Sequence, residues 1–278
     1  MKVGIVGMGV VGSAIYEGLE SKGHEVYAND VRDIEYVVNP LDFLVSTCEV
    51  IFICVPTPQK EGGVCDLSIV YKVFNDLHYH LAQKMREEAM DLPVIAIKST
   101  VIPGTADSLI KMYPRVCSNP EFMTEKNPLR DFLNPDRIIL GAKSQVVIDT
   151  MVKLYNDFDA PRHIVEPAEA EAIKYLSNSL LLTKVAFSQE ISRLCQMLRL
   201  NARLVYDGIT ADKRINPSHL DPTKGRVSIH TPCLAKDMRA LIEQLDKSGY
   251  DSILLKSAYA TAIDGVALRP ALKIVEEI

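Results

Sequence analysis

Three features are missing from this sequence, and each absence excludes a class of protein. No apolar run approaches the ~20 residues that a membrane helix needs. Lys and Arg form no cluster, and the formal net charge of -5 gives no electrostatic reason to bind nucleic acid or an anionic membrane. No small-residue cleavage site follows an apolar core near the N-terminus. We therefore expect a cytoplasmic protein with neither nucleic acid nor membrane as a partner.

Paired cysteine motifs are also missing. The sequence has six cysteines and no CxxC, and a chain of 278 residues does not need disulfides to fold. His78 and His80 are two residues apart on an expected helix, so they point in different directions. We predict six free thiols, most of them buried, and no metal site.

The first half of the chain has the pattern of an α/β protein. Apolar residues make up 47% of the sequence and charged residues 24%, as in globular domains. Short β-branched runs alternate with helical stretches, which predicts a Rossmann-type, doubly wound, mostly parallel sheet. Strands are expected at 2–7, 24–30, 49–55, 93–99, 115–119 and 136–142, helices at 11–21 and 66–89, and a long loop at 119–136.

The pattern changes near residue 165. Residues 167–200 read as one amphipathic helix, a less regular segment covers 207–232, and further helices begin near 234. We predict a dinucleotide-binding domain at 1–165 and an all-helical domain at 166–278. The helix expected at 167–200 would span roughly 50 Å, which is more than a small domain buries by itself. It therefore indicates a homodimer formed through the long helix.

A GxGxxG motif follows the first expected strand and opens the first helix. Gly7 would make the tight turn, Gly9 would let the backbone approach a pyrophosphate, and Gly12 would permit close helix–strand packing. Asp30 ends the second strand, where it can accept hydrogen bonds from ribose hydroxyls and repel a 2'-phosphate. The motif predicts NAD rather than NADP, although the nearby Arg32 weakens that preference. The alternative is a glycine-rich turn without a ligand.

Five further segments are more specific than the glycine motif. They are VPTP (55–58), KSTVIPGT (98–105), NPEFMTEKNPLRDFLNPDRIILG (119–141), EAEAIKYLSNSLLLTKVAFSQEISRLC (169–195) and CLAKDMRAL (233–241). In order and spacing they closely resemble the nucleotide-sugar dehydrogenases, the UDP-glucose and GDP-mannose 6-dehydrogenases, from residue 1 to about 241. The resemblance implies oxidation of a sugar-nucleotide primary alcohol to a carboxylate with two NAD in succession.

The resemblance also implies roles for individual residues. Cys233 would be the nucleophile that captures the aldehyde and carries a thioester. Lys174 and Asn178, one helical turn apart, would stabilise the oxyanion, and Asp237 would assist the base or water chemistry. Thr100 and Glu121 would position the hydrolytic water. Substrate contacts are expected from Glu121, Phe122, Glu125, Lys174 and Asn178, and cofactor contacts from Gly7, Gly9, Val10, Val11, Gly12, Asp30, Val55, Pro56, Thr57 and Thr100.

Each catalytic assignment has a plainer alternative. Cys233 could be ordinary packing, although the neighbouring Lys236 and Asp237 and an expected helix start predict a lowered thiol pKa. Lys174 and Asn178 could be solvated residues on an exposed helix face. Thr100 and Glu121 could be strand-end caps, and the prolines of 119–136 could merely shape a surface loop.

Two departures from the family pattern matter. The family's glycine-rich GFGGSC loop is replaced by GRVSIHTPCLAKD (225–237), which keeps only Gly225, puts Pro232 before the cysteine and adds His230. The family also continues with another α/β domain, whereas this chain ends at Ile278. A shortened chain, a separate polypeptide that supplies the domain, and a smaller substrate all fit that difference.

Two other functions remain open. A β-hydroxyacid or 6-phosphogluconate type of dehydrogenase would transfer one hydride without a cysteine, and a non-catalytic NAD-binding subunit would transfer none. Cys233→Ala separates the three, because it stops only the four-electron reaction.

Overall fold

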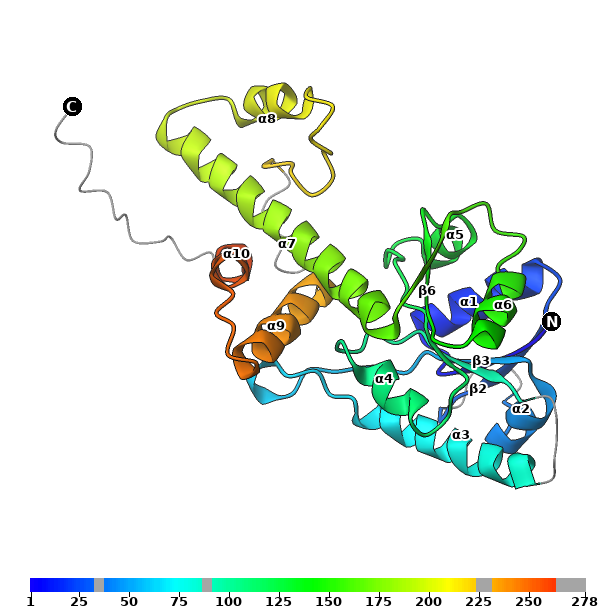
Figure 1. Ribbon diagram of the computed structural model, residues 1–278. Coiled ribbons are helices and arrows are strands. Elements are labelled where there is room, and N and C mark those ends of the chain that lie inside the picture. Colours follow the sequence, from blue (N-terminus) through cyan, green and yellow to red (C-terminus); the bar gives the residue numbers. More distant parts are fainter. Residues whose placement is uncertain (33–37, 87–91, 224–231, 264–278) are drawn as a thin grey trace. The chain divides into compact units, whose positions relative to one another are not determined.

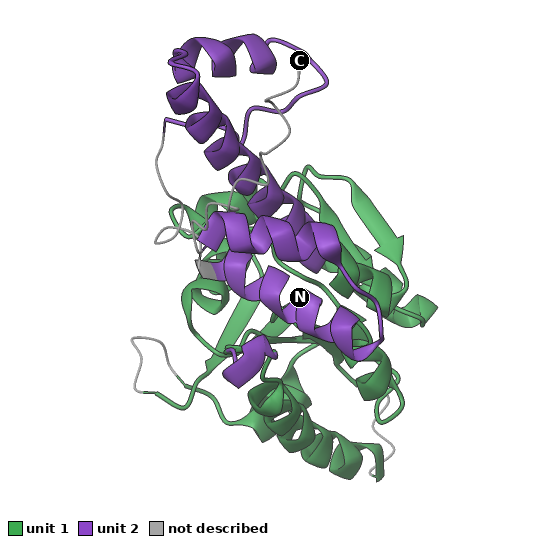
Figure 2. Ribbon diagram, turned by 90° about the vertical axis from the view of Figure 1, so that its left-hand side faces the viewer, with its two compact units in different colours: residues 1–58, 65–174 green, residues 59–64, 175–278 purple. Residues whose placement is uncertain are grey.

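The structure is a computed structural model that describes residues 1–32, 38–86, 92–223 and 232–263. The chain divides into two compact units (Figure 2). The first comprises residues 1–58 and 65–174, and the second comprises residues 59–64 and 175–278. The predicted domain boundary between 165 and 166 stays a prediction.

The first unit contains a seven-stranded sheet in the order β2-β1-β3-β4-β5-β6-β7. Figure 1 labels β2, β3 and β6 among its strands. Its pairs are parallel except β5 with β6, which are antiparallel and share the register pair Ser118↔Gly141. The strands are β1 (Lys2–Val6), β2 (Glu25–Asn29), β3 (Val50–Ile53), β4 (Val94–Ile97), β5 (Val116–Ser118), β6 (Ile138–Gly141) and β7 (Arg162–Val165). The order reverses between β1 and β3, which creates a crevice at the carboxyl ends of these strands.

Helices cover both faces of this sheet because its central strands are apolar on both sides. In β3, Val50 and Phe52 belong to one hydrophobic cluster, and Ile51 and Ile53 belong to the other. The first cluster takes in side chains of α1 (Val10–Ser21), α5 (Pro128–Leu133) and α6 (Gln145–Leu154). The second takes in side chains of α2 (Leu41–Thr47), α3 (Ser68–Arg86) and α4 (Thr105–Ile110). This arrangement confirms the predicted doubly wound fold.

The long loop expected at 119–136 contains helix α5, so the loop prediction was wrong for residues 128–133. Its six residues are too short for a periodic signal, and the helix is held by tertiary packing. Phe132 packs so closely on α1 that a Cβ at Gly18 would lie 2.3 Å from the Phe132 ring. The absence of a side chain at Gly18 of α1 therefore allows α5 to pack closely on the first unit.

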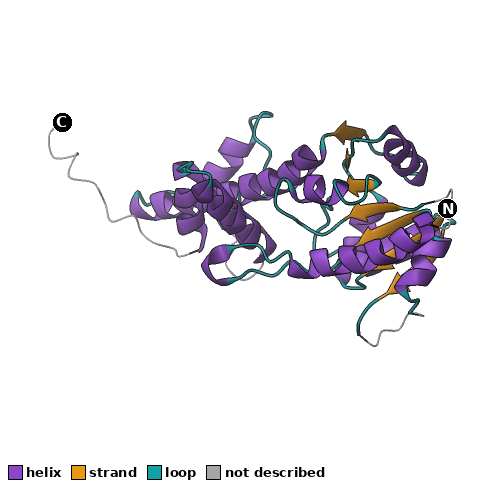
Figure 3. Ribbon diagram, turned by 60° about the horizontal axis from the view of Figure 1, so that its bottom comes forward, coloured by secondary structure: helices purple, strands orange, loops and turns teal. Residues whose placement is uncertain are grey.

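Helix α7 (Pro167–Met197) begins in the first unit and continues into the second. The second unit also contains η1 (Glu61–Gly63), α8 (Ala202–Thr210), α9 (Pro232–Lys247) and α10 (Ile253–Ile263). Figure 3 shows helices and loops, and no strand, over the described part of 175–263. Its core joins Leu182 and Val185 of α7 to Met238 and Ile242 of α9 and Ala258 of α10. Within the described residues, no helix combines the length and apolarity needed to cross a membrane.

The buried Glu171 of α7 caps helix α4 and so anchors the end of segment 98–105. Its carboxylate accepts the amides of Gly104 at 2.6 Å and Ala106 at 2.7 Å. Burial raises the pKa of Glu171 from 4.5 to about 7, against the opposing effect of the backbone hydrogen bonds. Between these pH values the folded state binds more protons than the unfolded chain, so this group makes the free energy of unfolding fall as pH rises.

Glu171→Gln is therefore expected to remove a pH dependence of stability. From pH 4.5 to 7 the wild type should lose up to about 3 kcal/mol relative to the variant, because the variant carries no proton to release. Urea unfolding of both proteins at several pH values measures the difference. A difference in the free energy of unfolding between the two proteins that stays constant from pH 4.5 to 7 would contradict the raised pKa of Glu171.

Candidate functional site

The glycine-rich turn between β1 and α1 is shaped by close backbone contacts. Gly7 has φ of 96°, and a Cβ there would lie 2.9 Å from the carbonyl carbon of Cys54. A Cβ on Gly12 would lie 2.0 Å from the Gly7 carbonyl oxygen. At Gly9, by contrast, a Cβ would meet nothing within 4 Å and would project into open space. The turn therefore fits a pyrophosphate that approaches Gly9 and the start of α1.

Asp30 lies directly after β2 and is tied to the same turn. Its carboxylate accepts the Met8 amide at 2.7 Å and the Arg32 guanidinium at 2.9 and 3.0 Å, and the side chain is 5% exposed. The Arg32 guanidinium holds the pKa of Asp30 well below its usual range. Asp30 is therefore a fixed, ionised carboxylate at the position where the ribose hydroxyls are expected. Hydrogen bonds from Arg32 occupy part of its acceptor capacity.

The VPTP segment follows β3 on the other side of the crevice. Val55 and Thr57 are buried, and Pro56 is exposed. Ser99, which follows β4, donates its hydroxyl to the Val55 carbonyl at 2.6 Å. Thr100 is half-buried beside it in sequence. This hydrogen bond thus links the segments that follow β3 and β4.

Glu121 and Lys174 form a buried ion pair in the first unit. The Lys174 ammonium donates to Glu121 Oε1 at 2.7 Å, and the two side chains are 7% and 15% exposed. Glu121 Oε2 also accepts the Met123 amide at 2.7 Å. Lys174 and Asn178 are both buried, so the alternative of two solvated residues was wrong. Burial fixes these groups in position, as a reacting site needs.

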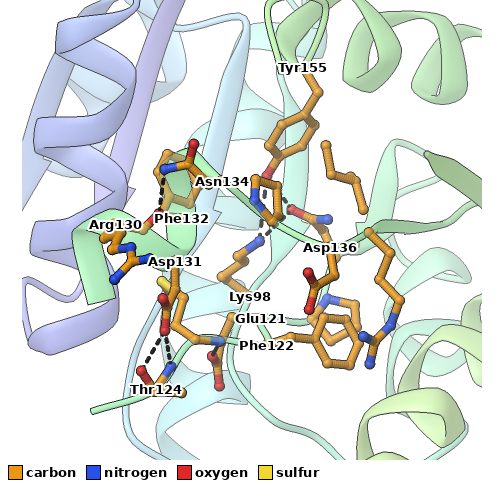
Figure 4. Close-up of a pocket in the computed structure, with 16 residues that line it drawn as sticks. Lys98, Glu121, Phe122, Thr124, Arg130, Asp131, Phe132, Asn134, Asp136 and Tyr155 are labelled. Atoms are coloured by element: carbon orange, nitrogen blue, oxygen red, sulfur yellow. Dashed lines mark hydrogen bonds between the residues drawn. The ribbon is translucent and has the colours of Figure 1, made fainter. Parts of the chain in front are cut away.

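A cavity of about 360 Å³ lies beside this pair, at the carboxyl ends of β4 and β5 (Figure 4). It is lined largely by segment 119–138, including Glu121 and Phe122. The Arg137 guanidinium stacks over the Phe122 ring at 4.0 Å. Glu125 is exposed and does not line the cavity, and its substrate role stays a prediction. The proline-rich segment thus encloses a cavity and does more than shape a surface.

Helix α9 carries the second group of expected catalytic residues. Cys233 is exposed in the first turn, and the other five cysteines, all within the described chain, are buried. Asp237, one turn further on, is 1% exposed and accepts Asn178 Nδ2 at 2.6 Å and Lys236 Nζ at 2.7 Å. The second unit therefore brings Asn178 and Asp237 together. Gly225 and His230 lie outside the described residues.

Residues 59–64, which include η1 and come from the first half of the chain, pack on α9. Gln59 Nε2 donates to the carbonyl oxygens of Gly63 and Lys236, both at 3.2 Å. Arg239 donates to the Gly62 carbonyl at 3.3 Å. A Cβ at Gly63 would lie 2.3 Å from Arg239 Cγ, so only glycine allows this contact. This element was not predicted from the sequence, and its signal is the Gly62–Gly63 pair after VPTP.

The chain matches two models of one protein family. Residues 37–159 match the NAD-binding domain of the UDP-glucose/GDP-mannose dehydrogenase family, and residues 168–262 match its central domain. UDP-glucose 6-dehydrogenase of Rickettsia bellii is 35% identical over 218 residues, which cover 75% of this chain and 48% of that protein. The Rickettsia typhi enzyme of the same name is 31% identical over 253 residues, 87% of this chain and 52% of that protein. The chain spans about half the length of these curated relatives.

The fold is also similar to solved structures. A UDP-glucose dehydrogenase from the hyperthermophilic archaeon Pyrobaculum islandicum superposes with a TM-score of 0.82 over 94% of this chain and 67% of that one. The sequences are 24% identical, so this likeness concerns the fold alone.

Proposed function

The chain belongs to the UDP-glucose/GDP-mannose dehydrogenase family, and from this premise we propose that it oxidises the primary alcohol of a UDP-glucose-like nucleotide sugar to the carboxylate. Family membership confirms the resemblance stated from the sequence. The match to the family's NAD-binding domain confirms NAD as the cofactor. The substrate and the reaction are proposals.

The cofactor would be held by the residues of the turn and the crevice. Gly7, Gly9 and Gly12 shape the pyrophosphate site, together with the start of α1 at Val10 and Val11. Asp30 would accept the adenosine ribose hydroxyls, and residues 55–57 with Thr100 would line the nicotinamide half. When bound, NAD accepts the hydride that leaves the substrate carbon.

The exposed Cys233 is the single observation that supports the covalent chemistry best. Burial raises the pKa of Cys54 and Cys117 to about 12, so these thiols stay protonated and unreactive. Cys233 stands instead at the amino end of α9, where the helix dipole favours a thiolate. Its sulfur would bond to the aldehyde carbon to give a hemithioacetal, and loss of a second hydride would give a thioester. Water would then break the C–S bond, releasing the carboxylate and the thiol.

The other buried groups would act on charge and water. Lys174 and Asn178, one turn apart on α7, would stabilise the oxyanion. Asp237 holds Asn178 and is held by Lys236, so it would orient the amide and assist proton transfer. Glu121, paired with Lys174, would orient the attacking water together with Thr100. The polar partners of Glu121 in the first unit, and those of Asp237 in the second, thus fix the orientation of each carboxylate within its own unit.

The test of this proposal is NAD reduction with a substrate panel. We expect turnover with one or more of UDP-glucose, other UDP-sugars and GDP-mannose, and none with small β-hydroxy acids. Turnover only with hydroxy acids would contradict the proposal and indicate a one-hydride dehydrogenase. NAD binding without any turnover would indicate a non-catalytic NAD-binding subunit. It would equally fit a reaction that needs additional protein to contact the nucleotide of the substrate.

We also propose a homodimer through α7, because this helix exposes a stripe of apolar side chains. Leu176, Leu180, Phe187 and Leu194 follow each other at intervals of four and seven residues, and each is more than half exposed. Leu180→Glu combined with Phe187→Glu should convert the dimer to a monomer, and light scattering measures the change in molecular mass. Leu254→Glu on α10, also exposed, is the matched control and should leave the dimer intact. A dimer that survives the double substitution would contradict this interface.

A further inference from the structure

A lysine is buried at the carboxyl edge of the sheet. Lys98 directly follows β4 and is 5% exposed. Its ammonium donates to Asn119 Oδ1 at 3.0 Å and to the Tyr155 hydroxyl at 3.4 Å, and it lies 6.0 Å from the centre of the Phe52 ring. Within the described chain no carboxylate forms an ion pair with it. A buried ammonium with neutral partners costs stability, so a role other than stability is indicated.

Asn119 is the junction of this network. Its side chain is 1% exposed, and Oδ1 accepts hydrogen bonds from both Lys98 and the Tyr155 hydroxyl, the latter at 2.7 Å. Asn119 Nδ2 donates to the Ile139 carbonyl at 2.8 Å, and its amide donates to the Ile97 carbonyl at 2.9 Å. Asn119 thereby ties the end of β4 to β6 where the sheet changes direction. Lys98 thus fixes Asn119, the residue at which the segment that lines the cavity begins.

Glu121 lies two residues beyond this junction. Its two oxygens accept the Lys174 ammonium and the Met123 amide, both at 2.7 Å. The charges of Lys98 and Glu121 attract each other through the protein interior, and those of Lys98 and Lys174 repel. These two effects act in opposite directions on the charge of Lys98.

We propose that Lys98 is a positioning residue, which fixes segment 119–123 through Asn119 and so holds Glu121 in place opposite Lys174. This inference deepens the proposed function and rests on it for the part that Glu121 plays in the reaction. The contact between Lys98 and Asn119 and the coupling of Lys98 to Glu121 do not depend on which substrate is oxidised.

The charge of Lys98 changes in an accessible pH range. Burial lowers the pKa of Lys98 to about 8. The groups that face it from the packed elements are Cys54 after β3, Cys117 on β5, Tyr155 after α6, Glu121, and Lys174 on α7. Burial raises the pKa of both cysteines to about 12 and that of Tyr155 well above its usual value, so these three stay neutral when Lys98 loses its proton.

A double-mutant cycle tests the coupling without any assay of activity. Lys98→Met and Glu121→Gln, singly and together, are compared by urea unfolding at pH 7. We expect their effects on the unfolding equilibrium constant to deviate from additivity by about threefold or more. Tyr155→Phe with Glu121→Gln is the matched control, because Tyr155 contacts Asn119 but carries no charge, and it should deviate less. Additive effects of Lys98→Met and Glu121→Gln would overturn the proposal.

The pH profile of turnover tests the role in the reaction. The wild type should lose kcat above about pH 8, Lys98→Arg should stay active without this alkaline limb, and Tyr155→Phe should retain the limb. Lys98→Met should lower kcat about 10-fold or more and lack the limb. An unchanged limb in Lys98→Met would overturn the proposal. Absence of wild-type turnover with every nucleotide sugar would overturn the proposed function alone, and the unfolding cycle would still decide the role of Lys98.

Discussion

Replacing Cys233 by alanine is expected to lower the rate of acid formation by about 1000-fold or more, with NAD affinity unchanged. The thiol would supply the bond that holds the aldehyde for its second oxidation, and no other described cysteine is exposed to replace it. The loss should fall on kcat, because the removed atom takes part in the chemistry. Acid is measured by chromatography of the products, and NAD affinity by calorimetry.

Cys48→Ala is the matched control for this variant. Cys48 is a buried thiol in the first unit, and burial raises its pKa to about 12. Its removal should cost some stability and leave acid formation within a fewfold of the wild type. Full acid formation by Cys233→Ala would contradict the covalent mechanism. An equal loss in Cys48→Ala would assign the effect to folding.

Substitution of alanine at two glycines of the same motif is expected to separate folding from cofactor binding. Gly12→Ala places a Cβ about 2.0 Å from the Gly7 carbonyl oxygen, so backbone must move. We expect a loss of roughly 3 kcal/mol in the free energy of unfolding. Gly9→Ala places its Cβ in open space, and because Gly9 is the N-cap of α1, where alanine is less favourable than glycine, it should cost about 1 kcal/mol or less.

For NAD binding, Gly9→Ala should have the larger effect of the two variants. Gly9→Ala should raise the Kd for NAD by about 10-fold or more, because its methyl group occupies the approach to the helix amides. Urea unfolding and calorimetric titration of NAD measure the two effects. A Gly9→Ala protein that binds NAD like the wild type would contradict the pyrophosphate site. A Gly12→Ala protein of wild-type stability would contradict the packing of the turn.

The structure could be predicted from the sequence where the local residue pattern and the tertiary packing favour the same element. The turn at residues 7–12 lies between an apolar strand and an amphipathic helix, so its glycines, its helix and Asp30 could all be placed in advance. The 31-residue α7 was predicted as a helix of 167–200 because its periodicity extends over many turns. Strand β7 and helices α2, α4 and α6 were missed, since short or partly polar elements carry little periodic signal.

The site could be predicted only in part. Glu121 and Lys174 are far apart in sequence, and their pairing depends on how β5 and α7 pack, which no local pattern encodes. Lys98 falls inside the expected strand 93–99 and was not singled out, because its partner Tyr155 lies at the end of α6 among ordinary core residues. Helix α5 can pack on α1 because Gly18 has no side chain. A single glycine inside an expected helix gives no sign of such a contact in the sequence.

The most direct test of the central claim is the number of NADH molecules formed per nucleotide sugar consumed. The experiment uses limiting UDP-glucose, or whichever nucleotide sugar supports turnover, with excess NAD, and quantifies both products at completion. Two NADH per sugar, with the uronic acid as the product, is the predicted result, because oxidation from alcohol to carboxylate removes two hydrides. One NADH per sugar, with an aldehyde or ketone as the product, would contradict the account.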